Sequence, residues 1–117
     1  MATISKIASD LRKYALSLPE AWEDFPWEHQ VCKVRKKIFL FCDNSGNKQL
    51  RVTVKLPESG MDVLEMPNAE MTGYGLGKAG WVSITFAPKD KPKLEALKAW
   101  TLESYKSIAP AKLAKLV

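Results

Sequence analysis

Apolar residues near both ends of the chain recur every three or four positions, as they do on one face of an α-helix. In the first stretch the recurring residues are Ile4, Ile7, Ala8, Leu11, Ala15 and Leu18. They predict a helix from about Thr3 to Ser17, with Thr3 as its N-cap, which ends before Pro19. The second stretch predicts a long helix from about Pro92, a residue suited to the first helical position, to Ile108. Its inner stripe would be Leu94, Leu97, Thr101, Ser104, Tyr105 and Ile108.

Alternation of apolar and polar residues predicts strands between these helices. It is clearest where Leu50, Val52, Val54 and Leu56 alternate with Arg51, Thr53 and Lys55. We expect a hairpin of Gln30–Val34 and Lys37–Cys42, a brief strand at Glu70–Thr72, and a strand Trp81–Phe86. A short helical turn after Pro57-Glu58 would point Met61 and Leu64 inward, and the aromatic-rich segment Glu20–Glu28 is expected to be a connecting loop.

This order of elements predicts a two-layer α+β fold. The sheet would be antiparallel, with about five strands and with the N-terminal and C-terminal helices on one face. Strict alternation requires one buried and one exposed sheet face. The 117 residues show no repeat or linker, so we expect a single domain over residues 1–117.

Composition narrows the class of protein further. No apolar run approaches the roughly 20 residues of a membrane span, and the first residues lack the apolar core of a signal peptide. We therefore expect a cytoplasmic protein. Two cysteines are too few for a disulfide framework. With Arg35-Lys36 as the hairpin turn, Cys32 would lie opposite Phe39 and Cys42 opposite His29, so both thiols are expected to be reduced core residues.

The net charge of +5 is distributed unevenly along the chain. Between Lys33 and Lys55, seven basic residues stand against Asp43 alone, so this segment carries +6. The preceding segment holds Glu20, Glu23, Asp24 and Glu28 and no basic residue. A charge distribution of this kind steers anionic partners toward one side of a molecule.

A glycine-rich segment, Gly73–Gly80, matches the dinucleotide-binding pattern G-x-G-x-x-G at Gly75, Gly77 and Gly80. That pattern binds pyrophosphate only between a strand and a helix. Here an alternating, strand-like segment follows, so we expect a β-loop and no cofactor. A phosphate-binding P-loop is excluded too, because Ala79 follows Gly77-Lys78 where a Ser or Thr is required. Lys78 could still hold an anion.

Several short motifs occur in an order that resembles the MmcQ/YjbR-like family of small bacterial proteins. They are Leu18-Pro19-Glu20-Ala21, Phe25-Pro26-Trp27, Lys37-Ile38-Phe39, Lys55-Leu56-Pro57-Glu58, Gly77-Lys78-Ala79-Gly80-Trp81-Val82 and Glu103-Ser104-Tyr105. The chain has Lys36 where the family pattern has Gly. The resemblance implies a fold like that of secretion chaperones and frataxin-like proteins, and it implies the family's label as DNA-binding proteins.

Catalytic and metal-binding functions find little support in the sequence. His29 is the only histidine, and no metal-ligand spacing such as CxxC or HExxH occurs. A Cys–His nucleophile would rest only on the register that places Cys42 opposite His29. The acidic ridge that frataxin-type iron binding uses is missing from the first predicted helix, which offers Asp10 alone. We therefore expect no enzyme activity, no metal and no cofactor.

Nucleic-acid binding is the specific function that the basic segment favours. Basic side chains at a hairpin tip and on one strand face would contact phosphates, and Trp81 would either stack on a base or be covered by a loop. The candidate residues are Lys33, Arg35, Lys36, Lys37, Lys48, Arg51, Lys55, Lys78 and Trp81. The alternative is a protein-interaction module, which forms a homodimer or docks an acidic segment of a partner and has no role with DNA.

Overall fold

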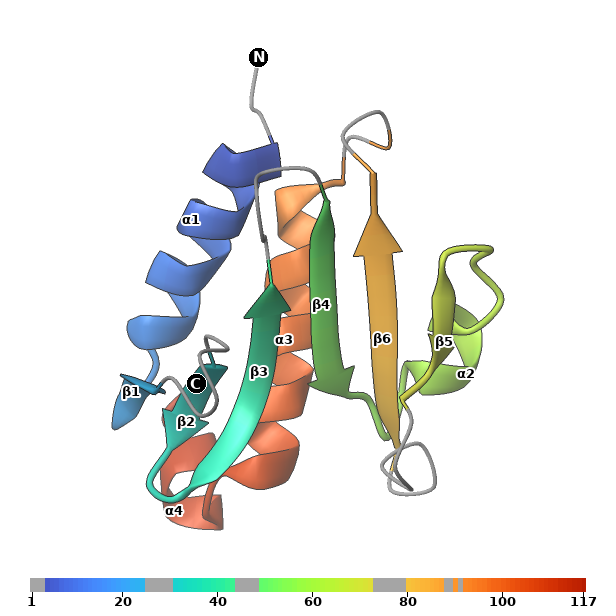
Figure 1. Ribbon diagram of the computed structural model, residues 1–117. Coiled ribbons are helices and arrows are strands. Elements are labelled where there is room, and N and C mark those ends of the chain that lie inside the picture. The colour runs from blue at the N-terminus through green and yellow to red at the C-terminus, as the bar shows by residue number, and fades with distance from the viewer. Residues whose placement is uncertain (1–3, 25–30, 44–48, 73–79, 88–89, 91) are drawn as a thin grey trace.

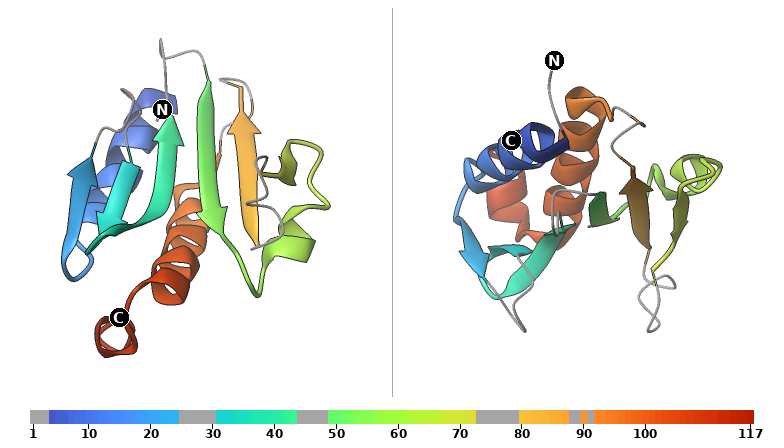
Figure 2. Two further views of the ribbon diagram at one scale, coloured as in Figure 1. Left: turned by 60° about the horizontal axis from the view of Figure 1, so that its bottom comes forward. Right: turned by 45° about the horizontal axis from the view of Figure 1, so that its top comes forward.

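In the part of the chain that the computed structural model describes, residues 4–24, 31–43, 49–72, 80–87, 90 and 92–117, two long helices lie on one face of a six-stranded antiparallel sheet (Figures 1 and 2). The elements in chain order are α1 (Ile4–Leu16), β1 (Ala21–Asp24), β2 (Val31–Val34), β3 (Lys37–Asp43), β4 (Leu50–Lys55), α2 (Gly60–Val63), β5 (Ala69–Met71), β6 (Trp81–Phe86), α3 (Leu94–Ile108) and α4 (Ala111–Ala114). The strand order is β1-β2-β3-β4-β6-β5. The predicted α+β fold is confirmed.

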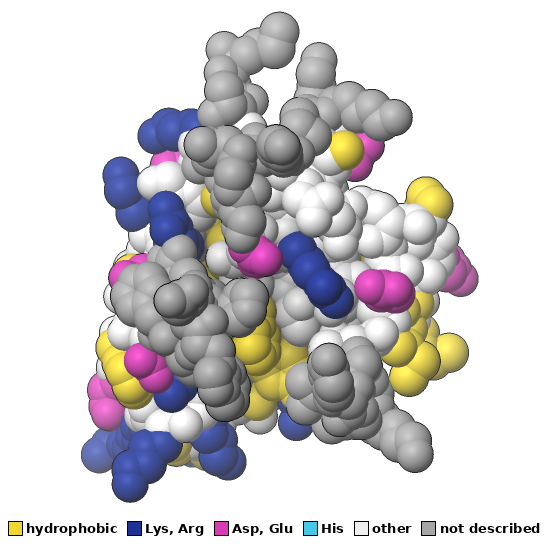
Figure 3. All heavy atoms as spheres, viewed as in Figure 1, with side chains coloured by type: hydrophobic (Ala, Val, Ile, Leu, Met, Phe, Trp, Pro, Cys, Tyr) yellow, Lys and Arg dark blue, Asp and Glu magenta, His cyan; other side chains and the backbone are white. Residues whose placement is uncertain are grey.

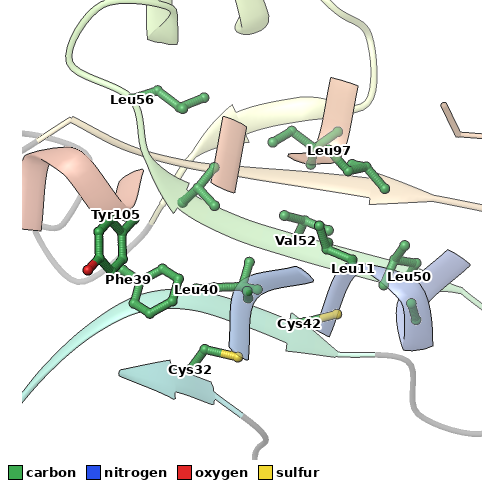
Figure 4. Close-up of a cluster of buried hydrophobic side chains, with 14 of the residues drawn as sticks. Leu11, Cys32, Phe39, Leu40, Cys42, Leu50, Val52, Leu56, Leu97 and Tyr105 are labelled. Atoms are coloured by element: carbon green, nitrogen blue, oxygen red, sulfur yellow. The ribbon is translucent and has the colours of Figure 1, made fainter. Parts of the chain in front are cut away.

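The hydrophobic core fills the space between the sheet and the two long helices, α1 and α3 (Figure 4). The apolar residues of β4 predicted to face inward, Leu50, Val52 and Val54, are fully buried there. Leu11 of α1 and Leu97 of α3 meet them from the helices. Farther along α3, the rings of Tyr105 and Phe39 pack edge to face, with centroids 5.2 Å apart. The periodicity of both helices therefore identified the core correctly.

The sixth strand, β1, lies where the sequence predicts a connecting loop. Glu20 takes a positive φ of 57° after Pro19, and Ala21–Asp24 then pairs antiparallel with β2, with Trp22 opposite Lys33. β1 is an edge strand, and none of its four residues is buried. A strand without a buried face leaves no alternation in the sequence, which is why the pattern missed it.

Two helix predictions need correction in detail. α2 begins at Gly60, later than expected, so Gly60 and Val63 face the interior while Met61 is 84% exposed. α3 begins at Leu94 after Lys93 as N-cap, so Pro92 precedes the helix and does not open it. The predicted cap Thr3 lies outside the described residues.

The β2–β3 hairpin turns at Arg35-Lys36, and Val34 lies opposite Lys37 as expected. A register shift between Cys32 and Lys33 then places Cys32 opposite Leu40, and not opposite the predicted Phe39. A β-bulge of this kind adds one residue to a strand and gives no signal in the hydrophobic pattern.

Both cysteines are free and buried in the core (Figure 4). Burial raises the pKa of the Cys32 thiol to about 12 and that of the Cys42 thiol to about 11. Since thiolates are the reactive form, both groups are protonated and inert near neutral pH. Among the described residues, no helix is long and apolar enough to cross a membrane.

Candidate nucleic-acid interface

The predicted basic residues are distributed over two regions, the open face of the sheet and the tip of the β2–β3 hairpin. Arg51 and Lys55 lie on the face of β4 opposite Leu50, Val52 and Val54, as predicted, but Thr53 between them is buried. Two more candidates, Lys48 and Lys78, lie outside the described residues. A described cation is a good candidate for phosphate contact only if it faces solvent and has no carboxylate partner.

The centre of the open face is electrically mixed (Figure 3). The guanidinium of Arg51 lies 3.7 Å from the carboxylate of Glu70 on β5, and Asp43 of β3 is its cross-strand neighbour. A phosphate at this position would meet the carboxylates as well as the cation. The strand face of β4 is consequently a weaker anion site than the sequence predicts.

Two other candidate cations pair with the acidic segment that precedes them. Lys33 Nζ lies 2.7 Å from a carboxylate oxygen of Asp24 and 5.2 Å from the centre of the Trp22 ring. Arg35 Nε lies 3.3 Å from Glu20 Oε1. Both contacts exist because residues 21–24 form β1 beside β2. The acidic and basic segments, which the sequence suggests as two separate poles, partly neutralise each other in the fold.

Trp81 lies on the face of the sheet away from the two long helices, as its alternation with Val82 predicts, but the residue is only 8% exposed. It is the cross-strand neighbour of Lys55 and packs edge to face on Phe41 of β3, with ring centroids 5.9 Å apart. Stacking on a base requires an accessible ring face. Trp81 is therefore buried against Phe41 and offers no accessible ring face for stacking.

The hairpin tip keeps its cations accessible. Lys36 and Lys37 are exposed, and among the described residues no carboxylate pairs with either. The turn residues Arg35–Lys37 and the junction Ile108–Pro110 between α3 and α4 together line a hollow of about 480 Å³. The hairpin turn therefore lies beside the junction that leads into α4.

The α4 segment carries further exposed cations that the sequence analysis did not select as candidates. Lys112 and Lys115, in and just after α4, are exposed, and no described carboxylate pairs with them either. Figure 3 shows Lys and Arg side chains gathered at the lower left, where the hairpin and α4 lie. We call Lys36, Lys37, Lys112 and Lys115 the basic tip. The sequence does indicate a basic C-terminal segment, because residues 106–117 contain three lysines and no Asp or Glu.

The described residues form no metal-binding cluster. No three His, Cys, Asp or Glu side chains of this part of the chain converge as metal ligands. His29 and the motif glycines Gly73, Gly75 and Gly77 lie outside the described residues. The strand β6 begins directly after Gly80, whose φ is 96°, so a strand and not a helix follows the glycines. This confirms that the segment lacks the context of a dinucleotide-binding loop.

Comparison with known proteins places the chain in a family. The sequence pattern of the YjbR family matches residues 16–107, which is most of the chain. The chain belongs to the YjbR family. The fold also resembles the crystal structure of Deinococcus radiodurans protein DR2400, described as a DUF419 domain, with a TM-score of 0.73 and 23% sequence identity over 99% of this chain and 91% of that one. A search of the curated proteins found no match.

Several YjbR motif segments meet at the end of α3. Ser104 Oγ donates to the Phe39 carbonyl at 2.5 Å and accepts from the Lys55 amide at 2.9 Å. The Tyr105 hydroxyl donates to the Pro19 carbonyl at 2.6 Å. These contacts join segments 18–21, 37–39 and 55–58 to α3.

The remaining residue of that motif, Glu103, holds the turn before α2. Its carboxylate accepts from the amides of Glu58 and Ser59, both at 3.0 Å, and from the Ser59 hydroxyl at 2.6 Å. The motif residues on α3 thus hold the fold together, and Lys37 of the basic tip belongs to one of the segments that they hold.

Proposed function

We propose that this YjbR protein is a non-catalytic cytoplasmic protein that binds DNA weakly, through electrostatic contact between the basic tip and the phosphate backbone. The observation that carries the proposal is the group of four exposed lysines at one end of the molecule, none paired with a described carboxylate. The label that the family resemblance implies points the same way.

The basic tip suits phosphate contact better than the predicted strand face for a physical reason. A Lys or Arg side chain that already pairs with a carboxylate must exchange that partner for a phosphate, and the carboxylate then repels the DNA. An exposed lysine instead exchanges only water and releases condensed counterions from the DNA. Lys33, Arg35 and Arg51 belong to the first class, while Lys36 and Lys37 belong to the second.

The salt dependence of binding gives a quantitative expectation. Each phosphate contact contributes a slope of about −0.9 to the plot of log affinity against log salt concentration. Four lysines therefore limit the slope to about −4 for duplex DNA, which corresponds to weak binding that is lost at high salt. Base-specific contacts are not required, so affinity should depend little on sequence.

Fluorescence polarisation tests the proposal with labelled duplex and single-stranded oligonucleotides at two ionic strengths. The double variant Lys36→Glu/Lys112→Glu should lose binding. The control Lys6→Glu/Lys93→Glu changes the net charge by the same amount and should retain DNA binding. Both of its residues lie at the N-terminal ends of helices, α1 and α3, away from the basic tip. Arg51→Glu, on the open face, should also bind nearly as well as the parent.

Three outcomes would contradict the proposal. A flat response at low salt would remove any role with DNA and leave the protein-interaction module. Equal loss in the tip and control variants would show that only net charge matters. Loss in Arg51→Glu with retention in the tip variant would move the site to the strand face.

A further inference from the structure

The corner formed by α2 and β5 combines exposed apolar side chains with negative charge. Met61 is 84% exposed and Met71 is 57% exposed. Residues 56–72 contain four acids and no Lys or Arg. Three of these acids, Glu58, Asp62 and Glu65, are exposed and form no ion pair within the described part of the chain. Figure 3 shows hydrophobic and acidic side chains together at the right edge, over α2 and β5. We call Met61, Asp62, Glu65 and Met71 the acidic corner.

The other end of the molecule has the complementary composition. Beside Lys112 and Lys115 of the basic tip, Leu116 is 67% exposed and Val117 is 38% exposed. The adjoining hollow is lined by Ile108, Ala109 and Pro110 as well as by the hairpin turn. Of the six large hydrophobic residues exposed in the described chain, two thus lie in the acidic corner and two lie beside the basic tip.

The sheet topology separates these two surfaces. The β2–β3 hairpin lies toward one edge of the sheet, and β5 forms the opposite edge. Figure 1 shows the same separation, with α4 below the hairpin and α2 beside β5. One molecule therefore carries an apolar, positive surface at one end and an apolar, negative surface at the other.

From this arrangement we propose that the acidic corner docks on the basic tip of a second copy of the chain. Opposite charges orient the encounter, and flexible methionine side chains adapt to an apolar partner surface. Because two different surfaces meet, the contact is heterologous, and a dimer keeps one unused acidic corner on one copy and one unused basic tip on the other. Association then continues head to tail beyond the dimer.

Sedimentation velocity without nucleic acid tests the arrangement. The weight-average mass should rise continuously with protein concentration, from about 10 µM to about 1 mM for a small interface of this type, and high salt should suppress the rise. A protein that remains monomeric throughout would overturn the proposal. A series that stops at the dimer would contradict the head-to-tail arrangement.

Single-surface variants make the test sharper. The corner variant Asp62→Lys/Glu65→Lys and the tip variant Lys112→Glu/Lys115→Glu should each be monomeric. In their equimolar mixture the intact tip of the corner variant meets the intact corner of the tip variant, and the reversed corner meets the reversed tip, so association should return. The charge-neutral combination of all four substitutions in one chain should restore association. Circular dichroism confirms that each variant is folded, and Lys6→Glu/Lys93→Glu serves as the control.

The outcome is distinguishable from that of the DNA proposal. The corner variant should lose self-association and keep DNA binding, whereas Lys112→Glu/Lys115→Glu should lose both. Self-association without DNA binding would overturn only the proposed function. DNA binding by a strictly monomeric protein would overturn only the head-to-tail association. A mixture of the two variants that stays monomeric would also overturn it.

Discussion

Thr101 and Ser104 lie one helical turn apart on α3, both fully buried, and their hydroxyl groups have opposite hydrogen-bonding states. Ser104 Oγ makes two hydrogen bonds, one to the Phe39 carbonyl and one from the Lys55 amide. Thr101 Oγ1 has no partner among the described residues. A buried polar group stabilises a fold only when it is paired, so removal of these two hydroxyls should have effects of opposite sign.

Ser104→Ala should lower the free energy of unfolding by about 2–4 kcal/mol, because it leaves a buried carbonyl and a buried amide without partners. Urea denaturation measures the change. Ser107→Ala is the matched control, since Ser107 is exposed and its hydroxyl donates only to a carbonyl one turn back. Equal effects of the two substitutions would show that Ser104 does not join the strands to α3.

Thr101→Val replaces the unpartnered hydroxyl with a methyl group of similar size. The free energy of unfolding should rise by about 1 kcal/mol, because the desolvation cost of the hydroxyl is removed and the volume is kept. The same denaturation experiment gives the result, with Thr101→Ser as control, which keeps the hydroxyl and loses the methyl. A loss of stability in the valine variant would mean that Oγ1 has a partner after all.

The core and the element types could be predicted because they depend on local periodicity. Leu11 and Leu97 repeat with the period of a helix, and Val52 and Val54 alternate with polar residues along a strand. Each pattern follows from the geometry of one element and its single buried face. β1 escaped prediction for the converse reason, since an edge strand with no buried residue has no such pattern.

The candidate site was harder to predict, because its charges depend on pairing between elements. The ion pair of Lys33 with Asp24 exists only through the register of β1 on β2. The α3–α4 junction lines the hollow beside the hairpin turn, and α4 with Lys112 follows this junction after Pro110. Alternation placed Trp81 on the open face correctly, but its burial depends on neighbours such as Phe41, which alternation along β6 does not reveal.

Arg35, which begins the hairpin turn, has a φ of 56°, a conformation that L side chains other than Asn or Asp adopt at a cost of about 1–2 kcal/mol. Its ion pair with Glu20 joins two half-exposed side chains and contributes little in water. Arg35→Gly should therefore be more stable than Arg35→Ala by about 1 kcal/mol, since both lose the pair and only glycine relieves the backbone. Thermal denaturation of the two variants provides the comparison, and a more stable alanine variant would contradict it.

Alkaline pH should destabilise the fold through the two buried thiols. Burial raises the pKa of Cys32 from 9.0 to about 12 and that of Cys42 from 9.0 to about 11, so the folded state holds protons that the unfolded chain releases. The stabilisation is fully present below pH 9 and is lost as the pH rises toward the folded values. Each thiol should contribute a loss of about 1.4 kcal/mol per pH unit in its window.

Denaturation at several pH values between 8 and 11 measures this loss, and the variants Cys32→Ala and Cys42→Ala isolate it. Tyr105 also has a pKa raised by burial, and the charge of Glu20 adds to the shift, so some pH dependence should remain in both variants. Each substitution should nevertheless reduce the slope of stability against pH above pH 9. In parallel, a thiol reagent at neutral pH should modify neither cysteine until the protein unfolds. Rapid modification of the native protein, or slopes equal to that of the parent, would show that the thiols are not held protonated by the core.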